Sequence, residues 1–171
     1  MTIAVQARNE SGHRGCYRQD VLARIAERVC RGERARGPLE VSVLFCDDAF
    51  IADLNRRFRR KRGPTDVLSF GQPDDKMGGD LPPDARTLGD IVISLDTVVR
   101  RCNGDPARAR AEVRLLFCHG LLHLLGYDHG SAAERESMTE KQAAYLEIPM
   151  EEAWIAEGHA HARANSARHG R

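Results

Sequence analysis

Apolar positions recur along the chain with two different periods, and these periods predict the order of helices and strands. Residues 17–31 repeat apolar side chains three and four positions apart, which is typical of an amphipathic helix. Residues 40–46 alternate between apolar and polar side chains, which predicts a half-buried strand. The short apolar runs 66–70 and 89–94 predict two more strands.

A second helix is predicted directly after the first of these strands. Asp47 or Asp48 can cap its start, and Gly63-Pro64 is expected to end it. A shorter helix is expected near residues 95–102, after the last predicted strand.

The longest helix is predicted from its start signal and from its apolar composition. Asp105 fits the capping position and Pro106 the first helical position. Residues 115–125 are apolar on nearly every side apart from two histidines, so we expect this half of the helix to be buried. Ser131 and Glu134 form the pattern of a capping box, which begins a final helix.

Two segments show neither the helical nor the strand period of apolar residues. Residues 71–87 are rich in Asp, Gly and Pro and predict a long loop. The end of the chain is rich in Ala, Arg, His and Gly. We therefore expect residues 1–150 to form a single domain and residues 151–171 to form a C-terminal extension that is partly disordered.

Composition narrows the class of protein without naming a partner. The 171 residues suffice for one domain with a hydrophobic core, and the net charge of +1 indicates no partner by itself. The chain begins without a signal-peptide pattern and has no apolar run near the roughly 18 residues of a membrane span. Its five cysteines lack Cys-x-x-Cys spacing, which favours a reducing, cytoplasmic location.

Three histidines carry the clearest chemical signal. His119 and His123 are four residues apart and therefore share one face of the predicted long helix. His129 would lie about 15 Å from His119 if the helix continued, but Gly126 is the residue type that ends helices and lets the chain turn back. The spacing predicts a three-histidine zinc site with one open position, which is typical of catalytic rather than structural zinc.

The same spacing occurs in the metzincin proteases, whose zinc motif is His-Glu-x-x-His-x-x-Gly-x-x-His. The protease places its general base, a glutamate, directly after the first histidine, where this chain has Gly120. Peptide hydrolysis by that route is therefore disfavoured. A zinc ion held by three neutral imidazoles keeps its full charge and suits an anionic substrate such as a phosphodiester.

A dense basic segment, residues 56–62, offers a second chemical signal. Six of its seven residues are Arg or Lys, which is more positive charge than a helix end requires. One interpretation is a solvated helix end, and the other is a phosphate-binding patch. From the residues alone, the histidines and this segment together indicate hydrolysis of an anionic ester.

Four stretches of the chain resemble the YbeY family of bacterial endoribonucleases. They are Leu54-Asn55 with Phe58-Arg59, then residues 64–70, residues 88–94, and His119 to His129 with Met138 beyond. The chain departs from the usual family pattern at Gly71, commonly a proline, and at Arg62, often an acidic residue.

The resemblance implies an α+β fold, with a small mixed four-stranded sheet packed with about five or six helices and a metzincin-like zinc helix. It implies a cytoplasmic, single-strand-selective endoribonuclease that matures ribosomal RNA at the 3′ end of the small subunit. The expected partners are ribosomal RNA, small-subunit proteins and assembly proteins, with no membrane. It also implies that one zinc ion is held by His119, His123 and His129, and that Arg59 is catalytic.

Two alternatives stay open at this point. One is a metzincin-like metalloprotease, indicated by the histidine spacing. The other is a non-catalytic, zinc-containing ribosome assembly factor, in which a protein side chain such as a cysteine would fill the fourth metal position.

Overall fold

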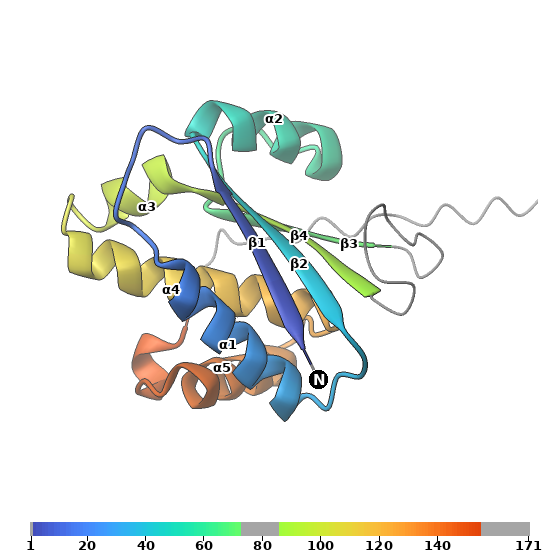
Figure 1. Cartoon of the computed structure of the whole chain (residues 1–171). Coiled ribbons are helices and arrows are strands. Elements are labelled where there is room, and N and C mark those ends of the chain that lie inside the picture. Colours follow the sequence, from blue (N-terminus) through green and yellow to red (C-terminus); the bar gives the residue numbers. More distant parts are fainter. Residues whose placement is uncertain (1, 73–85, 155–171) are drawn as a thin grey trace, which may run out of the picture.

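The computed structural model describes residues 2–72 and 86–154 of the chain. A four-stranded mixed sheet forms its centre, with helices on both faces (Figure 1). The strands are β1 (Ile3–Asn9), β2 (Leu39–Cys46), β3 (Val67–Gly71) and β4 (Arg86–Ser94). The α-helices are α1 (Gln19–Gly32), α2 (Asp48–Arg59), α3 (Leu95–Arg101), α4 (Pro106–Leu124) and α5 (Ala132–Leu146), followed by a 3-10 helix, η1 (Met150–Glu152). The predicted α+β fold class is confirmed.

The strands lie in the order β1-β2-β4-β3. β1, β2 and β4 are parallel, while β3 runs antiparallel to β4 and forms one edge of the sheet. The apolar pattern predicted β2, β3 and β4 but not β1. Its signal is the alternation of buried Ile3 and Val5 with exposed Ala4 and Gln6 at the start of the chain.

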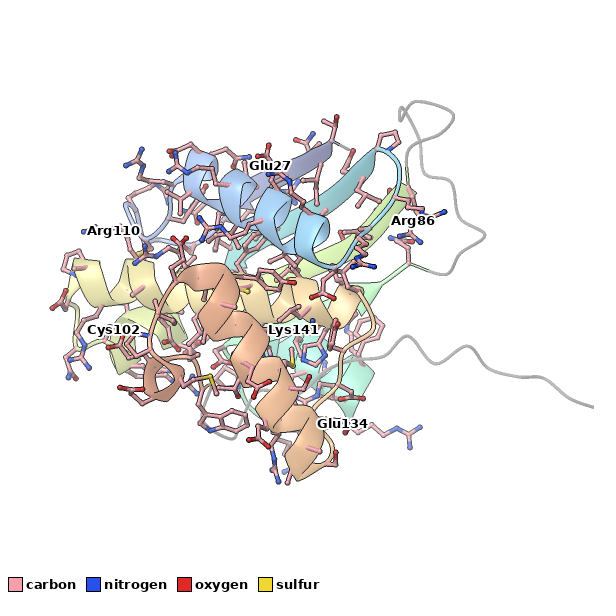
Figure 2. All side chains as sticks on the ribbon, turned by 90° about the horizontal axis from the view of Figure 1, so that it is seen from below. Glu27, Arg86, Cys102, Arg110, Glu134 and Lys141 are labelled. Atoms are coloured by element: carbon pink, nitrogen blue, oxygen red, sulfur yellow. The ribbon has the colours of Figure 1, made fainter. Side chains whose placement is uncertain are left out.

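Two hydrophobic cores lie on the two faces of the sheet. The larger core packs α1 and α4 against one face, and the smaller packs α2 against the other. Figure 1 shows these helices on opposite sides of the sheet. In the view from below in Figure 2, α5 lies in front of α4, with Glu134 and Lys141 along its length. The helix that carries two of the predicted metal ligands is therefore held between the sheet and α5.

The start signals of the last two long helices are confirmed. The Asp105 carboxylate accepts hydrogen bonds from two backbone N–H groups of the first turn of α4, and Pro106 occupies its first position. Ser131 and Glu134 form the predicted capping box at the start of α5. The apolar half of α4 is buried, as predicted.

The second helix is shorter than the prediction that placed its end at Gly63-Pro64. α2 ends at Arg59, because Arg60 adopts a left-handed conformation with φ of 55°. The Asn55 side chain then donates a hydrogen bond of 2.9 Å to the carbonyl of Gly63, which holds the following segment. The basic segment is therefore half helix and half loop.

Both segments that lack a period fall largely outside the described residues. The predicted loop 71–87 includes residues 73–85, and the predicted extension 151–171 includes residues 155–171. Ala153, near the start of that extension, is fully buried. None of the described helices combines the length and apolar character needed to cross a membrane.

Candidate functional site

The three predicted metal ligands meet at the end of α4 and in the turn that follows it. Ring nitrogens of His119, His123 and His129, which we call the histidine cluster, all lie within 4.8 Å of one another. The Nε2 atoms of His119 and His123 are 3.2 Å apart. Two nitrogens bound tetrahedrally to one zinc ion would be separated by about 3.4 Å, given Zn–N distances of about 2.0–2.1 Å. The donor atoms therefore fit a single small metal ion.

A glycine turn brings the third histidine back to the helix. Gly126 has a positive φ of 101°, and the N–H groups of Gly126 and Tyr127 donate to the carbonyls of His123 and Leu122 at 2.9 and 3.1 Å. This pair of bonds is the Schellman motif, which ends a helix and reverses the chain. The turn directs the chain so that His129 joins the cluster, as its spacing predicts.

Contacts among buried groups fix the orientation of His119. The Nδ1 atom of this 4% exposed residue lies 2.7 Å from Oε1 of Gln142. The Gln142 side chain donates its own N–H to the carbonyl of Ala153, so its oxygen must face the histidine. His119 then carries its proton on Nδ1 and presents the lone pair of Nε2 to the cluster.

A second set of contacts holds the turn that carries His129. The backbone N–H of His129 donates to the Asp128 carboxylate at 2.8 Å. The Tyr127 hydroxyl donates to Glu33 at 2.6 Å, and Lys141 donates to the other oxygen of Glu33 at 2.7 Å. Burial alone would raise the pKa of Glu33, but the hydrogen bonds from Lys141 and nearby tyrosines outweigh it and lower the pKa. Glu33 is thus an ionised anchor between α1, this turn and α5.

Gly120, between the first two histidines, is needed for the packing of α4 on the sheet. A Cβ atom at this position would lie 2.9 Å from Oγ of Ser69 and 3.0 Å from Cγ2 of Ile91. A longer side chain would therefore point into the sheet. The absence of the protease glutamate thus has a steric reason as well as a chemical consequence.

Cysteine does not complete the histidine cluster. All five cysteines are free and buried. Cys118, next to His119, is fully buried, and burial raises the pKa of its thiol to about 12. The group that can hold a metal consists of the three histidines alone within the described residues. Such a site leaves one tetrahedral position for water or substrate.

Arg59 lies in the last turn of α2, on a different element from the histidine cluster. It is half-buried, while the other basic residues of the basic segment are exposed. Its guanidinium donates to Oδ1 of Asn55 at 3.1 Å and lies in the field of Asp66 at the start of β3. Burial lowers the pKa of Arg59, and the Asp66 charge opposes that shift.

The remaining charges of the basic segment divide into two groups. Arg56 and Arg57 both pair with Asp53 on the same helix, at 2.5 and 2.7 Å. The residues after the helix end, 60–62, are exposed and have no ion-pair partner within residues 2–72 and 86–154. Among the described residues, the loop half of the segment therefore carries the positive charge that no ion pair neutralises.

Two other polar residues near the sheet have distinct surroundings. Ser69 is buried, and its hydroxyl has no hydrogen-bond partner in the described part of the chain. Asp90 lies on β4 opposite Phe70, and burial raises the pKa of its carboxyl despite a hydrogen bond from Ser42. Asp90 faces away from the histidines, because its neighbour Ile91 packs on α4.

The contacts that hold His119 and Arg59 were not predicted from the sequence. Gln142 lies on the buried face of α5, four residues after Met138, and a polar side chain at such a position is an available signal. Asn55 is likewise 3% exposed on α2 and bonds to both Gly63 and Arg59. Nothing in the spacing alone indicates which partner either side chain meets.

Comparison with known proteins bears on the whole domain. The sequence profile of the family described as "Endoribonuclease YbeY" matches residues 6–148. Endoribonuclease YbeY of Moorella thermoacetica is 41% identical over 129 residues, covering 73% of this chain and 82% of the relative. Endoribonuclease YbeY of Syntrophomonas wolfei is 38% identical over 123 residues, covering 70% of this chain and 79% of the relative.

A solved structure shares the fold. The solution structure of TM1509 from Thermotoga maritima aligns with a TM-score of 0.52 and 26% sequence identity. The alignment covers 88% of this chain and 89% of that protein. The family profile extends over both the histidine cluster and the basic segment, and with these relatives it shows that the chain belongs to the endoribonuclease YbeY family.

Proposed function

We propose that this chain is a metal-dependent endoribonuclease that cleaves RNA phosphodiester bonds in ribosomal RNA processing. The observation that carries the proposal is the histidine cluster, with nitrogens within 4.8 Å, in a member of the endoribonuclease YbeY family. We further propose that the metal is a single zinc ion, because three imidazole nitrogens are a ligand set that zinc favours.

His119, His123 and His129 would hold the ion. A zinc ion bound there supplies a Lewis acid for a phosphate oxygen and lowers the pKa of a bound water to about 7. The role of the protein is to keep three neutral nitrogens aimed at one point. The Gln142 contact to His119 and the Asp128 contact to His129 support that role.

Arg59 is proposed to neutralise the charge that builds on the scissile phosphate. A guanidinium donates two parallel hydrogen bonds to phosphate oxygens and stays charged at every physiological pH. Asn55 and the field of Asp66 hold Arg59 in one place, which lowers the cost of orienting it during the reaction. Its half-buried position makes it the best placed of the basic residues for such a role.

The substrate is proposed to be single-stranded RNA, with the 3′ end of small-subunit ribosomal RNA as the site of processing. The exposed charges of residues 60–62, which have no ion-pair partner among the described residues, support binding to a phosphate backbone. Small-subunit ribosomal proteins and assembly proteins are the proposed protein partners.

The two alternatives receive less support. A metzincin-like protease needs a carboxylate at position 120, where a side chain would meet Ser69 and Ile91. A structural zinc site needs a fourth protein ligand, and the group formed by the described residues contains three.

The test is cleavage of a single-stranded RNA that spans the 3′ end of precursor small-subunit RNA, with the product ends mapped. Arg59→Ala should lower kcat by about 100-fold, the usual loss when one transition-state donor is removed. Arg31→Ala, which removes an exposed arginine from the last turn of α1, is the matched control and should leave kcat unchanged. Equal cleavage by wild type and Arg59→Ala would refute the role of Arg59, and no cleavage by wild type at any metal concentration would refute the function.

A further inference from the structure

Phe58, in the last turn of α2, is the most exposed of the large apolar side chains in the described residues. It is 57% exposed, and its ring lies 5.0 Å from the ring of Phe70 at an interplanar angle of 68°. In an edge-to-face pair, whichever ring offers its edge, at least one face of Phe58 is left uncovered by Phe70. An aromatic face is thus available to a ligand.

The fold gives no reason for this exposed ring. The small core beneath α2 is formed by Cys46, Ile51, Leu68 and Val92, with Leu44, Leu54 and Phe70 packed against it. Phe58 is not part of that core, and its ring contacts Phe70, which packs against the core. A second exposed phenylalanine, Phe50, lies in the first turn of the same helix and is 43% exposed. No aromatic partner of Phe50 occurs among the residues described.

The charges around Phe58 indicate what kind of ligand would use the ring. Arg57 and Arg59 flank it in sequence, and the exposed basic residues 60–62 follow directly. Positive charge that tracks a backbone, combined with an aromatic side chain on which a base stacks, is the common chemistry of single-strand nucleic-acid sites. An acidic or apolar protein partner would use the charge or the apolar surface, but it would not require an aromatic ring.

The position of Phe70 links this ring pair to the histidine cluster. Phe70 and Ser69 are neighbours on β3, so their side chains point to opposite faces of the sheet. Ser69 packs against Gly120, directly after His119, while Phe70 contacts Phe58. The ring pair and the histidine cluster therefore flank the same short stretch of the edge strand.

We propose that Phe58, supported by Phe70, is a base-stacking site for single-stranded RNA at the edge strand β3, whose other face packs against the helix of the histidine cluster. The inference rests on the proposed nuclease function and adds the residue that would select unpaired RNA. In a duplex both faces of a base are covered by its neighbours, so only an unstacked base can lie on the ring.

The decisive measurement is binding rather than cleavage. The full-length His123→Ala protein is mixed with a fluorescein-labelled single-stranded oligoadenylate, and the dissociation constant is measured by anisotropy at fixed salt. Adding Phe58→Leu, which keeps an apolar side chain but removes the ring, should weaken binding by about 10-fold. Adding Phe58→Trp should retain or improve binding. Phe50→Leu is the matched control on the same helix and should have no effect.

Two further readouts separate stacking from other causes. An oligonucleotide with 2-aminopurine in place of one adenine should lose fluorescence when it binds, and Phe58→Leu should abolish that quenching. The slope of binding against salt should be the same with and without Phe58→Leu, because the substitution removes no charge. Circular dichroism of each variant checks that α2 remains folded.

Unchanged affinity and unchanged quenching in Phe58→Leu would overturn the proposal. So would the combination of unchanged RNA binding with lost binding to purified small ribosomal subunits, which would assign the ring to a protein contact. If wild type binds RNA through Phe58 but never cleaves it, the nuclease function fails while the stacking site stands. If wild type cleaves RNA and Phe58→Leu binds RNA normally, the nuclease function stands and the stacking site fails.

Discussion

The histidine cluster and the basic segment are built in opposite ways. Each histidine of the cluster lies in or beside a network of short contacts, such as the chain from His119 through Gln142 to Ala153. Most of the basic segment is exposed, and its loop half carries charges without ion-pair partners in the described residues. The three histidines are thus held together by the protein itself, whereas the helical half of the basic segment is held by contacts of single side chains, such as Arg59 with Asn55 and Phe58 with Phe70.

The largest effect is expected from a substitution that disrupts the packing of α4 on the sheet beneath the histidine cluster. Gly120→Glu forces a side chain into Ser69 and Ile91, so we expect the free energy of unfolding to fall by about 3 kcal/mol or more. Urea denaturation, monitored by circular dichroism, measures this free energy of unfolding. Gly12→Glu is the matched control, because a Cβ at Gly12 has nothing within 4 Å, and it should change stability little. Equal stability of the two variants would show that α4 can move away from the sheet freely.

The next effect concerns the support of His119. Gln142→Leu removes the oxygen that accepts the Nδ1 proton, so we expect the affinity for zinc to fall by about 10- to 100-fold. Competition with a chromogenic chelator measures this affinity. Gln142→Glu keeps an oxygen at that position and should retain most of the affinity for zinc. If Gln142→Leu binds zinc as tightly as wild type, the positions of the ligands do not depend on this network.

The third prediction concerns the stability that Asp48 provides at the start of α2. Asp48, in its first turn, accepts hydrogen bonds from Ser94, Thr97 and Arg100 at 2.6, 2.6 and 2.8 Å. Burial would raise the pKa of Asp48, but these bonds outweigh it and lower the pKa. Because the folded pKa lies below the unfolded value of about 3.9, the ionised Asp48 stabilises the fold at neutral pH. That stabilisation is lost as the pH falls through the folded pKa.

Asp48→Asn should therefore lower the free energy of unfolding by about 1–2 kcal/mol at pH 7. The difference from wild type should shrink as the pH falls below about 4, where Asp48 itself becomes protonated. Denaturant titrations at several pH values provide the measurement. A difference that stays constant down to pH 2 would assign the loss to packing rather than to charge.

The smallest effect concerns the exposed end of the same helix. Lys61→Gln removes one charge that has no ion-pair partner among the described residues, so RNA affinity should fall only a few-fold. The slope of log affinity against log salt should decrease by about 1, as expected for one lost phosphate contact. A fluorescence titration at several salt concentrations tests this. An unchanged slope would place Lys61 outside the path of the RNA.

Most of the fold follows from local patterns, and the failures have local causes. Start signals such as Asp105-Pro106 predict α4 correctly, because a cap and a proline act within one helical turn. The end of α2 was misplaced, because Asn55 and the left-handed Arg60 stop the helix before any glycine or proline does. β1 was missed although its alternation is present at the start of the chain.

The candidate site likewise contains features that local sequence predicts and features that it does not. The convergence of the three histidines is predicted from the sequence. A four-residue spacing places His119 and His123 on one face of a helix, and the turn at Gly126 brings the third histidine back to them. The contacts of Gln142 and Asn55 could not be predicted, because each depends on how separate elements pack. The ring contact between Phe58 and Phe70 likewise joins α2 to β3 across the fold.

The histidine cluster is proposed to hold the metal that RNA cleavage requires. The most direct test of this proposal is a titration of zinc into metal-free protein, with bound metal and cleavage of single-stranded RNA measured in the same samples. We expect cleavage to rise until one ion is bound per chain, and His123→Ala to abolish both metal binding and cleavage. His13→Ala, which removes a histidine that contacts Asp96 outside the cluster, should behave as wild type. Full cleavage by metal-free protein or by His123→Ala would contradict the account.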